Sequence, residues 1–160
     1  MGLVSVNDYH FVTQWRVKAT PEQVYAVLGD PLDLPRWWPD VYLSATEAQP
    51  ADAAGLNRVI RLRTKGFLPY RLKWEMRVTE VTPFSGFALA ATGDFDGGGR
   101  WRFTADGEWT DIEFDWRIVA EKPLLKMLSF ALKPLFSWNH EWAMKKGLES
   151  LKQEIGQRFG

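Results

Sequence analysis

The chain has 160 residues and a mass of 18.4 kDa, which is the size of one domain with room for both a core and an internal pocket. Twenty basic and twenty acidic residues cancel, and the pI near 6.7 argues against a nucleic-acid partner. The absence of cysteine excludes disulfides and thiolate chemistry, and two histidines far apart in sequence form no metal-ligand motif. We expect a single cytoplasmic domain over residues 1–160 without metal or other cofactor.

The first ten residues carry neither the basic start nor the apolar run of a signal peptide, so we expect no export. Gly2 is compatible with myristoylation, but Val6 stands where that motif requires Ser or Thr.

Residues 9–18 alternate, which predicts a half-buried first strand with Tyr9, Phe11, Trp15 and Val17 on its apolar face. Thr20 to Gln23 reads as a capping box with proline at the first helical position, and Gly29 closes the short helix. The next segment has prolines at 31, 35 and 39, which permit only a second, broken turn of helix that carries Trp37 and Trp38.

From residue 41 to about 120 the period is two, as in an antiparallel sheet with one wet and one dry face. The pattern predicts strands over residues 41–48, 56–65, 70–78, 87–91, 101–103 and 112–118. Asp106–Gly107 predicts a hairpin between the last two strands. Across that hairpin, Arg100 and Arg102 are expected near Glu113 and Asp115. We interpret Gly97–Gly99 as a flexible hairpin or bulge, since no P-loop residues follow.

The last segment has helical spacing, with Met144, Leu148, Leu151 and Ile155 on one stripe. Pro134 is the expected start of this long helix, and Ser137, His140 and Glu141 bring polarity to its first turns. A curved antiparallel sheet wrapped around the helix would bury both dry faces, which makes the fold class α+β. Nine tryptophans exceed the need of a small core, so we expect aromatic side chains to line a cavity.

The order of these elements is similar to that of the START-like polyketide cyclase/dehydrase and lipid-transport family, also called SRPBCC. The resemblance rests on FVTQWRVKATPEQVYAVLGDP followed by RWWPDV near the start, and on FSWNHEWAMKKGLESL at the end. It implies a helix-grip fold, with seven strands around the C-terminal helix, two short helices between strands 1 and 2, and a deep apolar cavity. Members of the family bind lipids, sterols, polyketides or plant hormones, and only some are enzymes.

His140 is the candidate for acid–base chemistry, because it is the one imidazole on the inner half of the predicted helix. The alternative is a histidine that bonds a nearby carbonyl at the cavity mouth. Glu141, its neighbour, diverges from it by about 100° on a helix, so any orienting partner must come from the sheet. Arg58 falls on the dry face and needs a carboxylate partner such as Glu141, an edge position or an anionic ligand group.

Other side chains are candidates for ligand contact, although each of them can instead be core or cap. They are Trp37, Trp38, Trp74, Met76, Trp101, Trp116, Asn139 and Met144.

Three functions remain open at this point. The first is binding of a small hydrophobic, lipid-, polyketide- or aromatic-type molecule, and the second is a cyclase or dehydratase that uses His140. The third is a lipid-transfer module that touches membranes through residues 122–138, a basic and apolar segment too short and interrupted to span a bilayer. That segment can equally be a connector packed over one end of the cavity.

Overall fold

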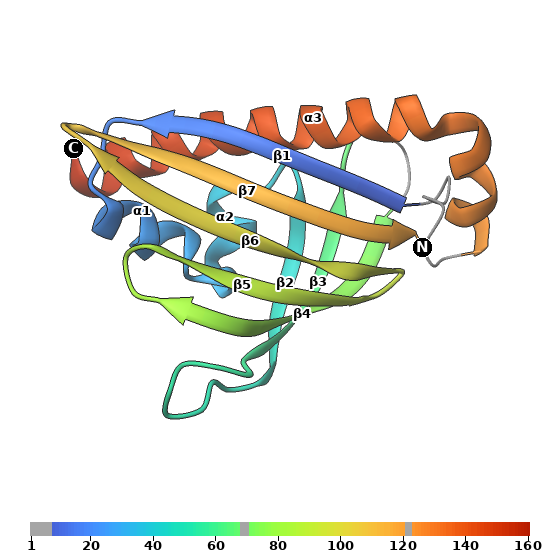
Figure 1. Ribbon diagram of the computed structural model, residues 1–160, viewed down its shortest axis with the longest axis horizontal. Helices are drawn as coiled ribbons and strands as arrows, with labels where there is room; N and C mark the ends of the chain where they lie inside the picture. Colours follow the sequence, from blue (N-terminus) through green and yellow to red (C-terminus); the bar gives the residue numbers. More distant parts are fainter. Residues whose placement is uncertain (1–7, 68–70, 121–122) are drawn as a thin grey trace, which may run out of the picture.

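The computed structural model describes residues 8–67, 71–120 and 123–160, and for residues 120 and 123–132 it describes the backbone alone. Seven strands form one antiparallel sheet in the order β1-β7-β6-β5-β4-β3-β2. The sheet curls around the long helix α3 (Pro123–Phe159), and β1 runs alongside that helix (Figure 1). The expected helix-grip architecture is therefore confirmed.

The chain enters through β1 (Asp8–Val17) and α1 (Pro21–Leu28), followed by the 3-10 turn η1 (Pro31–Asp33) and the short helix α2 (Leu34–Trp37). The predicted capping box is present. The backbone N–H of Gln23 donates to Thr20 Oγ1 at 3.2 Å, and the backbone N–H of Thr20 donates to the side-chain Oε1 of Gln23 at 3.0 Å. The prolines restrict the connector to these two short turns, as expected.

The remaining strands are β2 (Tyr42–Gln49), β3 (Val59–Lys65), β4 (Arg71–Thr82), β5 (Gly86–Gly93), β6 (Phe95–Asp106) and β7 (Trp109–Ala120). The predicted hairpin joins β6 to β7, with Gly107 at a φ of 61°. Arg102 lies opposite Glu113 and within 3.8 Å of it. Arg100 lies opposite Asp115, but its guanidinium bonds Glu80 on β4 at 2.7 Å.

The interpretation of Gly97–Gly99 as a flexible hairpin or bulge is wrong, because all three residues lie inside β6 and pair in regular register with both β5 and β7. A Cβ at Gly99 would lie 2.6 Å from Trp116 Cε3 and 3.0 Å from Phe114 Cε1. The missing side chain therefore lets two aromatic rings lie over the strand.

The start of α3 also differs from the prediction, because the helix begins at Pro123 and Pro134 lies within it. The intervening residues, mostly Leu, Lys, Met, Phe and Ala, include no glycine, so the helix continues through the proline. Figure 1 shows the axis turning near this N-terminal end, as a proline inside a helix favours. The predicted stripe is confirmed: Met144, Leu151 and Ile155 are buried and Leu148 is half-buried.

A cluster of charged side chains joins the end of α3 to the connector that carries α2. Arg36 bonds both Asp33 and Glu154, and Arg158 lies 2.9 Å from Glu154 and 3.2 Å from Asp33. The two guanidinium groups lower the pKa of Glu154, whose side chain is 7% exposed. This ion cluster holds the connector against the helix.

Candidate functional site

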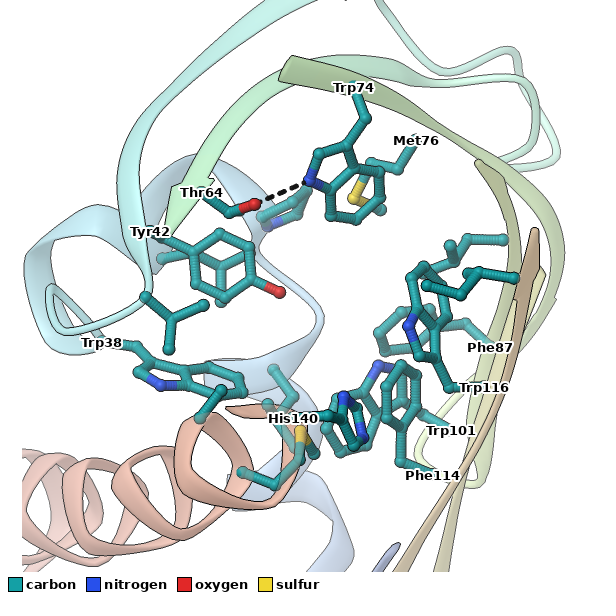
Figure 2. A pocket seen from close by; sticks show the side chains of 18 of the residues that line it. Trp38, Tyr42, Thr64, Trp74, Met76, Phe87, Trp101, Phe114, Trp116 and His140 are labelled. Carbon is teal, nitrogen blue, oxygen red and sulfur yellow. Dashed lines mark hydrogen bonds between the residues drawn. The ribbon is translucent and has the colours of Figure 1, made fainter. Parts of the chain in front are cut away.

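A cavity of about 350 Å³ lies between the concave face of the sheet and α3. Its walls come from the connector between α1 and β2, from both edges and the centre of the sheet, and from the half of α3 that follows Pro134. Figure 2 shows Trp38 and Tyr42 on one side of the space and Phe87, Trp101, Phe114 and Trp116 on the other, with His140 reaching in from α3. The cavity is therefore framed by aromatic rings.

The wall over β6 and β7 is a continuous row of rings. Phe114 stacks on Trp101 at 4.1 Å and on Trp116 at 5.4 Å between centroids, and Trp116 lies 5.7 Å from Trp74. Trp15, which is buried in the core and does not line the cavity, lies 5.4 Å from Trp101. The row presents flat, polarizable faces to the cavity.

The opposite wall is built on α3. The Trp38 ring lies directly on Gly147, where an added Cβ would overlap the indole. Trp38 also lies 5.9 Å from Trp15 and 5.1 Å from Tyr42. Burial raises the pKa of Tyr42, so its hydroxyl, which points into the cavity in Figure 2, stays protonated. Gly147 thus fixes how closely the connector approaches the helix.

Two polar groups of the sheet satisfy each other at one end of the cavity. The Trp74 indole nitrogen donates to Thr64 Oγ1 at 3.1 Å, and both side chains are buried (Figure 2). The Trp74 ring is thereby held in place without a ligand.

His140 lies against Phe11, with the two rings stacked at 4.0 Å between centroids. Its Nε2 atom is buried and has no hydrogen-bond partner, and the same holds for Nε1 of Trp38. Burial lowers the pKa of His140 to about 4, because an apolar environment disfavours the charged imidazolium. Figure 2 shows the Trp38 nitrogen on the edge of its ring away from the cavity, so the neutral imidazole of His140 is the group that can bond a ligand.

Most of the side chains singled out in the sequence line the cavity. They are Trp38, Arg58, Trp74, Met76, Trp101, Trp116, Asn139, His140 and Met144. Trp37 and Glu141 are not among the lining residues, since Trp37 is buried in the core beside Trp38 and Glu141 is exposed.

Arg58 has a carboxylate partner, but the partner is not Glu141. Its Nε donates to Glu47 Oε1 on the edge strand β2 at 2.9 Å. The edge position allows both charged groups to remain partly solvated, which removes the need for an anionic ligand group.

Several lining residues were not predicted as site residues, among them Phe11, Tyr25, Tyr42 and Phe114. The alternation already places Phe11 and Phe114 on the dry face, so parity could have found them. Tyr42 could not be found in this way, because a register shift between Tyr42 and Ser44 breaks the alternation in β2.

Residues 122–138 lie partly outside the described part of the chain, so the lid and membrane-contact hypotheses stay predictions. Phe136, near the end of this segment, does line the cavity. Among the described residues, no helix is both long and apolar enough to cross a membrane.

Comparison with known proteins places this geometry in a family. A family model described as polyketide cyclase/dehydrase and lipid transport matches residues 9–156. No curated protein matches the chain.

Solved structures at low sequence identity share the fold. The protein TTHA0849 of Thermus thermophilus is 17% identical with a TM-score of 0.79, over 95% of this chain and 100% of that one. The Zhui aromatase/cyclase from Streptomyces sp. R1128 is 17% identical with a TM-score of 0.73, over 96% of each chain. A START superfamily protein from Mycobacterium smegmatis is 14% identical with a TM-score of 0.75, over 92% of this chain and 97% of that one. With its sequence matched over residues 9–156 and its helix-grip fold, the chain belongs to the polyketide cyclase/dehydrase and lipid transport family.

Proposed function

We propose that the protein binds a small, flat, largely apolar molecule in the cavity between the sheet and α3. The observation that carries this proposal is the pair of facing aromatic walls, Trp38 with Tyr42 on one side and the row from Trp101 to Trp74 on the other. A volume of about 350 Å³ lies in the range of small-molecule pockets.

The polar groups of the cavity favour a neutral ligand with one hydrogen-bonding group. His140 Nε2 is buried and unpaired, and a ligand group that bonds it would remove an unsatisfied polar atom. Among the described lining residues, the charged ones are Arg58 and Lys65, and Arg58 already pairs with Glu47. A ligand such as an aromatic ketone or phenol fits these features better than a fatty acid.

Calorimetric titration with polycyclic aromatic ketones, flavonoids and saturated fatty acids tests the proposal. We expect one flat molecule per chain, and a stabilisation of about 2.7 kcal/mol at a hundredfold excess over its dissociation constant. Native mass spectrometry of freshly purified protein would reveal a ligand acquired during expression. Failure of the whole aromatic panel to bind or to raise the melting temperature would overturn the proposal.

A matched pair of tryptophan substitutions on α3 locates the ligand. Ala143→Trp should fill the cavity that Ala143 lines and abolish binding, whereas Gln153→Trp, on the exposed face of the same helix, should leave binding unchanged. Equal binding by both variants would place the ligand elsewhere.

A cyclase or dehydratase reaction in the same cavity is the second candidate function, and the unpaired Nε2 of His140 is the observation that favours it. Two other features weigh against it. With a pKa of about 4, only about one imidazole in a thousand carries a proton at pH 7. Among the described residues, no carboxylate bonds His140 to orient it.

The substitution His140→Ala separates binding from catalysis. For a binding protein, affinity should fall by about 0.5–1.5 kcal/mol, which is the net contribution of one hydrogen bond. For an enzyme that uses this imidazole, affinity should persist while the rate falls by about two to four orders of magnitude. We expect the first result, with the ligand recovered chemically unchanged after long incubation with the wild type.

A further inference from the structure

Basic residues are concentrated in one short stretch of a chain whose total charge is zero. Between residues 58 and 77, Glu75 is the one acidic residue, and the basic residues are Arg58, Arg61, Arg63, Lys65, Arg71, Lys73 and Arg77. This stretch contains β3 and the first part of β4, so the charge belongs to one hairpin. The rest of the chain is acidic on balance.

Like charges lie directly opposite each other near the end of this hairpin. Arg63 pairs with Lys73 and Lys65 with Arg71 in the register of β3 and β4, while Arg61 lies opposite Glu75 and bonds it at 3.1 Å. Like-charged pairs facing each other destabilise an antiparallel sheet.

Carboxylates do not neutralise these two pairs. Among the described residues, no carboxylate forms an ion pair with Arg63, Lys65, Arg71 or Lys73, although Asp94 accepts a hydrogen bond from the backbone amide of Lys73. We call these four residues the basic hairpin end. Such a cluster is a surface prepared for a negatively charged partner.

Large apolar side chains are exposed beside the basic hairpin end. Phe67, which follows β3, is 59% exposed, and Trp138 and Leu135 of α3 are 44% and 39% exposed. The rings of Phe67 and Trp138 lie 4.8 Å apart, so Phe67 and this face of α3 form one apolar patch. Phe67 follows Lys65 by two residues, so the backbones of the patch and of the basic hairpin end lie within about 7 Å of each other at this point, inside one Debye length.

We propose that the basic hairpin end and the apolar patch of Phe67, Leu135 and Trp138 dock on an anionic lipid bilayer. Aromatic rings favour the headgroup level of a membrane, and basic side chains around them favour anionic lipids. An acidic protein would match the charge but would leave the exposed rings unexplained. Lys65, Gly66 and Asn139 also line the cavity, so docking brings one end of the cavity to the bilayer.

Vesicle co-sedimentation of the full chain, without added ligand, tests this docking independently of the proposed function. We expect binding to vesicles of phosphatidylcholine mixed with phosphatidylserine and not to phosphatidylcholine alone. Because the attraction is screened, binding should weaken strongly between about 0.1 and 0.5 M salt. Equal binding to both kinds of vesicle, or no binding to either, would overturn the proposal.

Charge reversal on the hairpin gives a variant whose folding is not at risk. Arg63→Glu combined with Arg71→Glu places an acid opposite Lys73 and Lys65, so the melting temperature should rise or stay the same. Neither residue lines the cavity. The partition coefficient on anionic vesicles should fall at least about tenfold, since each basic residue contributes about 1 kcal/mol near such a surface.

The matched control reverses two charges at the other end of the molecule. Lys18→Glu with Lys152→Glu changes the net charge equally, and both residues are exposed near the opposite end of the fold, where β1 and α3 end (Figure 1). This variant should keep most of the vesicle binding. An equal loss of binding in the two charge-reversed variants would mean that net charge alone drives binding, and it would overturn the proposal. Phe67→Ser with Trp138→Ser should weaken binding at unchanged charge. Wild-type protein that binds soluble polyglutamate but no vesicle would identify an acidic polypeptide as the partner and overturn the lipid assignment.

Discussion

The two histidines carry the same imidazole in opposite surroundings. His10 lies on the wet face of the sheet, where its Nε2 is 2.8 Å from Asp115. His140 is stacked on Phe11 inside the cavity, and burial lowers its pKa to about 4. Proton uptake by His140 is therefore coupled to unfolding.

The stability of the wild type should fall as the pH is lowered from about 6.5 to about 4. In this window the unfolded chain binds a proton at its ordinary histidine pKa near 6.5, while the folded chain resists until about 4. Because the unfolded state binds more protons in this window, acidification lowers the free energy of unfolding, by at most about 3 kcal/mol. Urea unfolding at a series of pH values measures it.

The variant His140→Phe isolates this contribution, since the carboxylates titrate equally in both proteins. The free energy of unfolding of His140→Phe should vary less between pH 6.5 and 4 than that of the wild type. Parallel curves for the two proteins would show that His140 does not resist protonation.

At the scale of elements, α3 divides into a half that seals the core and a half that borders the cavity. Leu151 is fully buried, while Ser137 is only half-buried. Leu151→Ala should cost about 2–5 kcal/mol, because it removes buried methyl groups and leaves a void. Ser137→Ala should cost less than about 0.5 kcal/mol. Chemical denaturation compares the two, and small, equal effects would mean that the sheet does not grip the helix.

Two glycines in α3 should respond to alanine with opposite signs. A methyl group added at Gly156 would have no atom within 4 Å, so Gly156→Ala should stabilise the helix by up to about 1 kcal/mol. At Gly147 the same methyl would overlap the Trp38 ring, so Gly147→Ala should lower the melting temperature and reduce ligand affinity. A stabilising Gly147→Ala would show that Trp38 does not lie against the helix.

At the scale of the whole molecule, the ion cluster of Arg36, Asp33, Glu154 and Arg158 joins the connector to the end of α3. Glu154→Gln leaves two guanidinium groups with one fewer carboxylate, and should cost about 1–3 kcal/mol at pH 7. The cost should shrink in acid, because the lowered pKa means that Glu154 contributes stability above its ordinary pKa and loses it as pH falls below that range.

Glu149→Gln on the same helix is the matched control for this prediction. Its carboxylate lies 3.8 Å from Lys146 in an exposed pair, so the substitution should cost less than about 0.5 kcal/mol. Thermal unfolding of the two variants at pH 7 and pH 4 compares them. If both cost the same at pH 7, the connector is held by packing alone.

Much of the fold could be predicted from the sequence because its elements are half-buried. Alternation is strong in β4 and β7, where each residue faces either water or the core, and the stripe from Met144 to Ile155 reads plainly as one helix face. The predicted start of α3 at Pro134 is wrong, since local sequence does not reveal that a helix continues through a proline. Gly97–Gly99 resembles a loop until the rings that cover it are known.

The site was harder to predict than the fold for a physical reason. The alternation of residues along a strand distinguishes side chains that face the core side of the sheet from those that face water, and it correctly places Trp74, Trp101 and Trp116 on the core side. Whether an inward ring meets another side chain or an open space depends on contacts between distant segments. The pairing of Arg58 with Glu47 and the position of Glu141 outside the cavity depend on such contacts, which no local pattern encodes.

The row of rings also determines the tryptophan fluorescence of the protein. Trp38, Trp15 and Trp101 lie 5.9 and 5.4 Å apart in succession, and the row continues through Phe114 and Trp116 to Trp74. Indoles this close exchange excitation energy before they emit, so the five tryptophans act as one antenna instead of five separate emitters. A coloured or quenching molecule anywhere along the cavity should therefore darken the emission of all five together. The intrinsic fluorescence of the protein reports whether its own cavity is occupied.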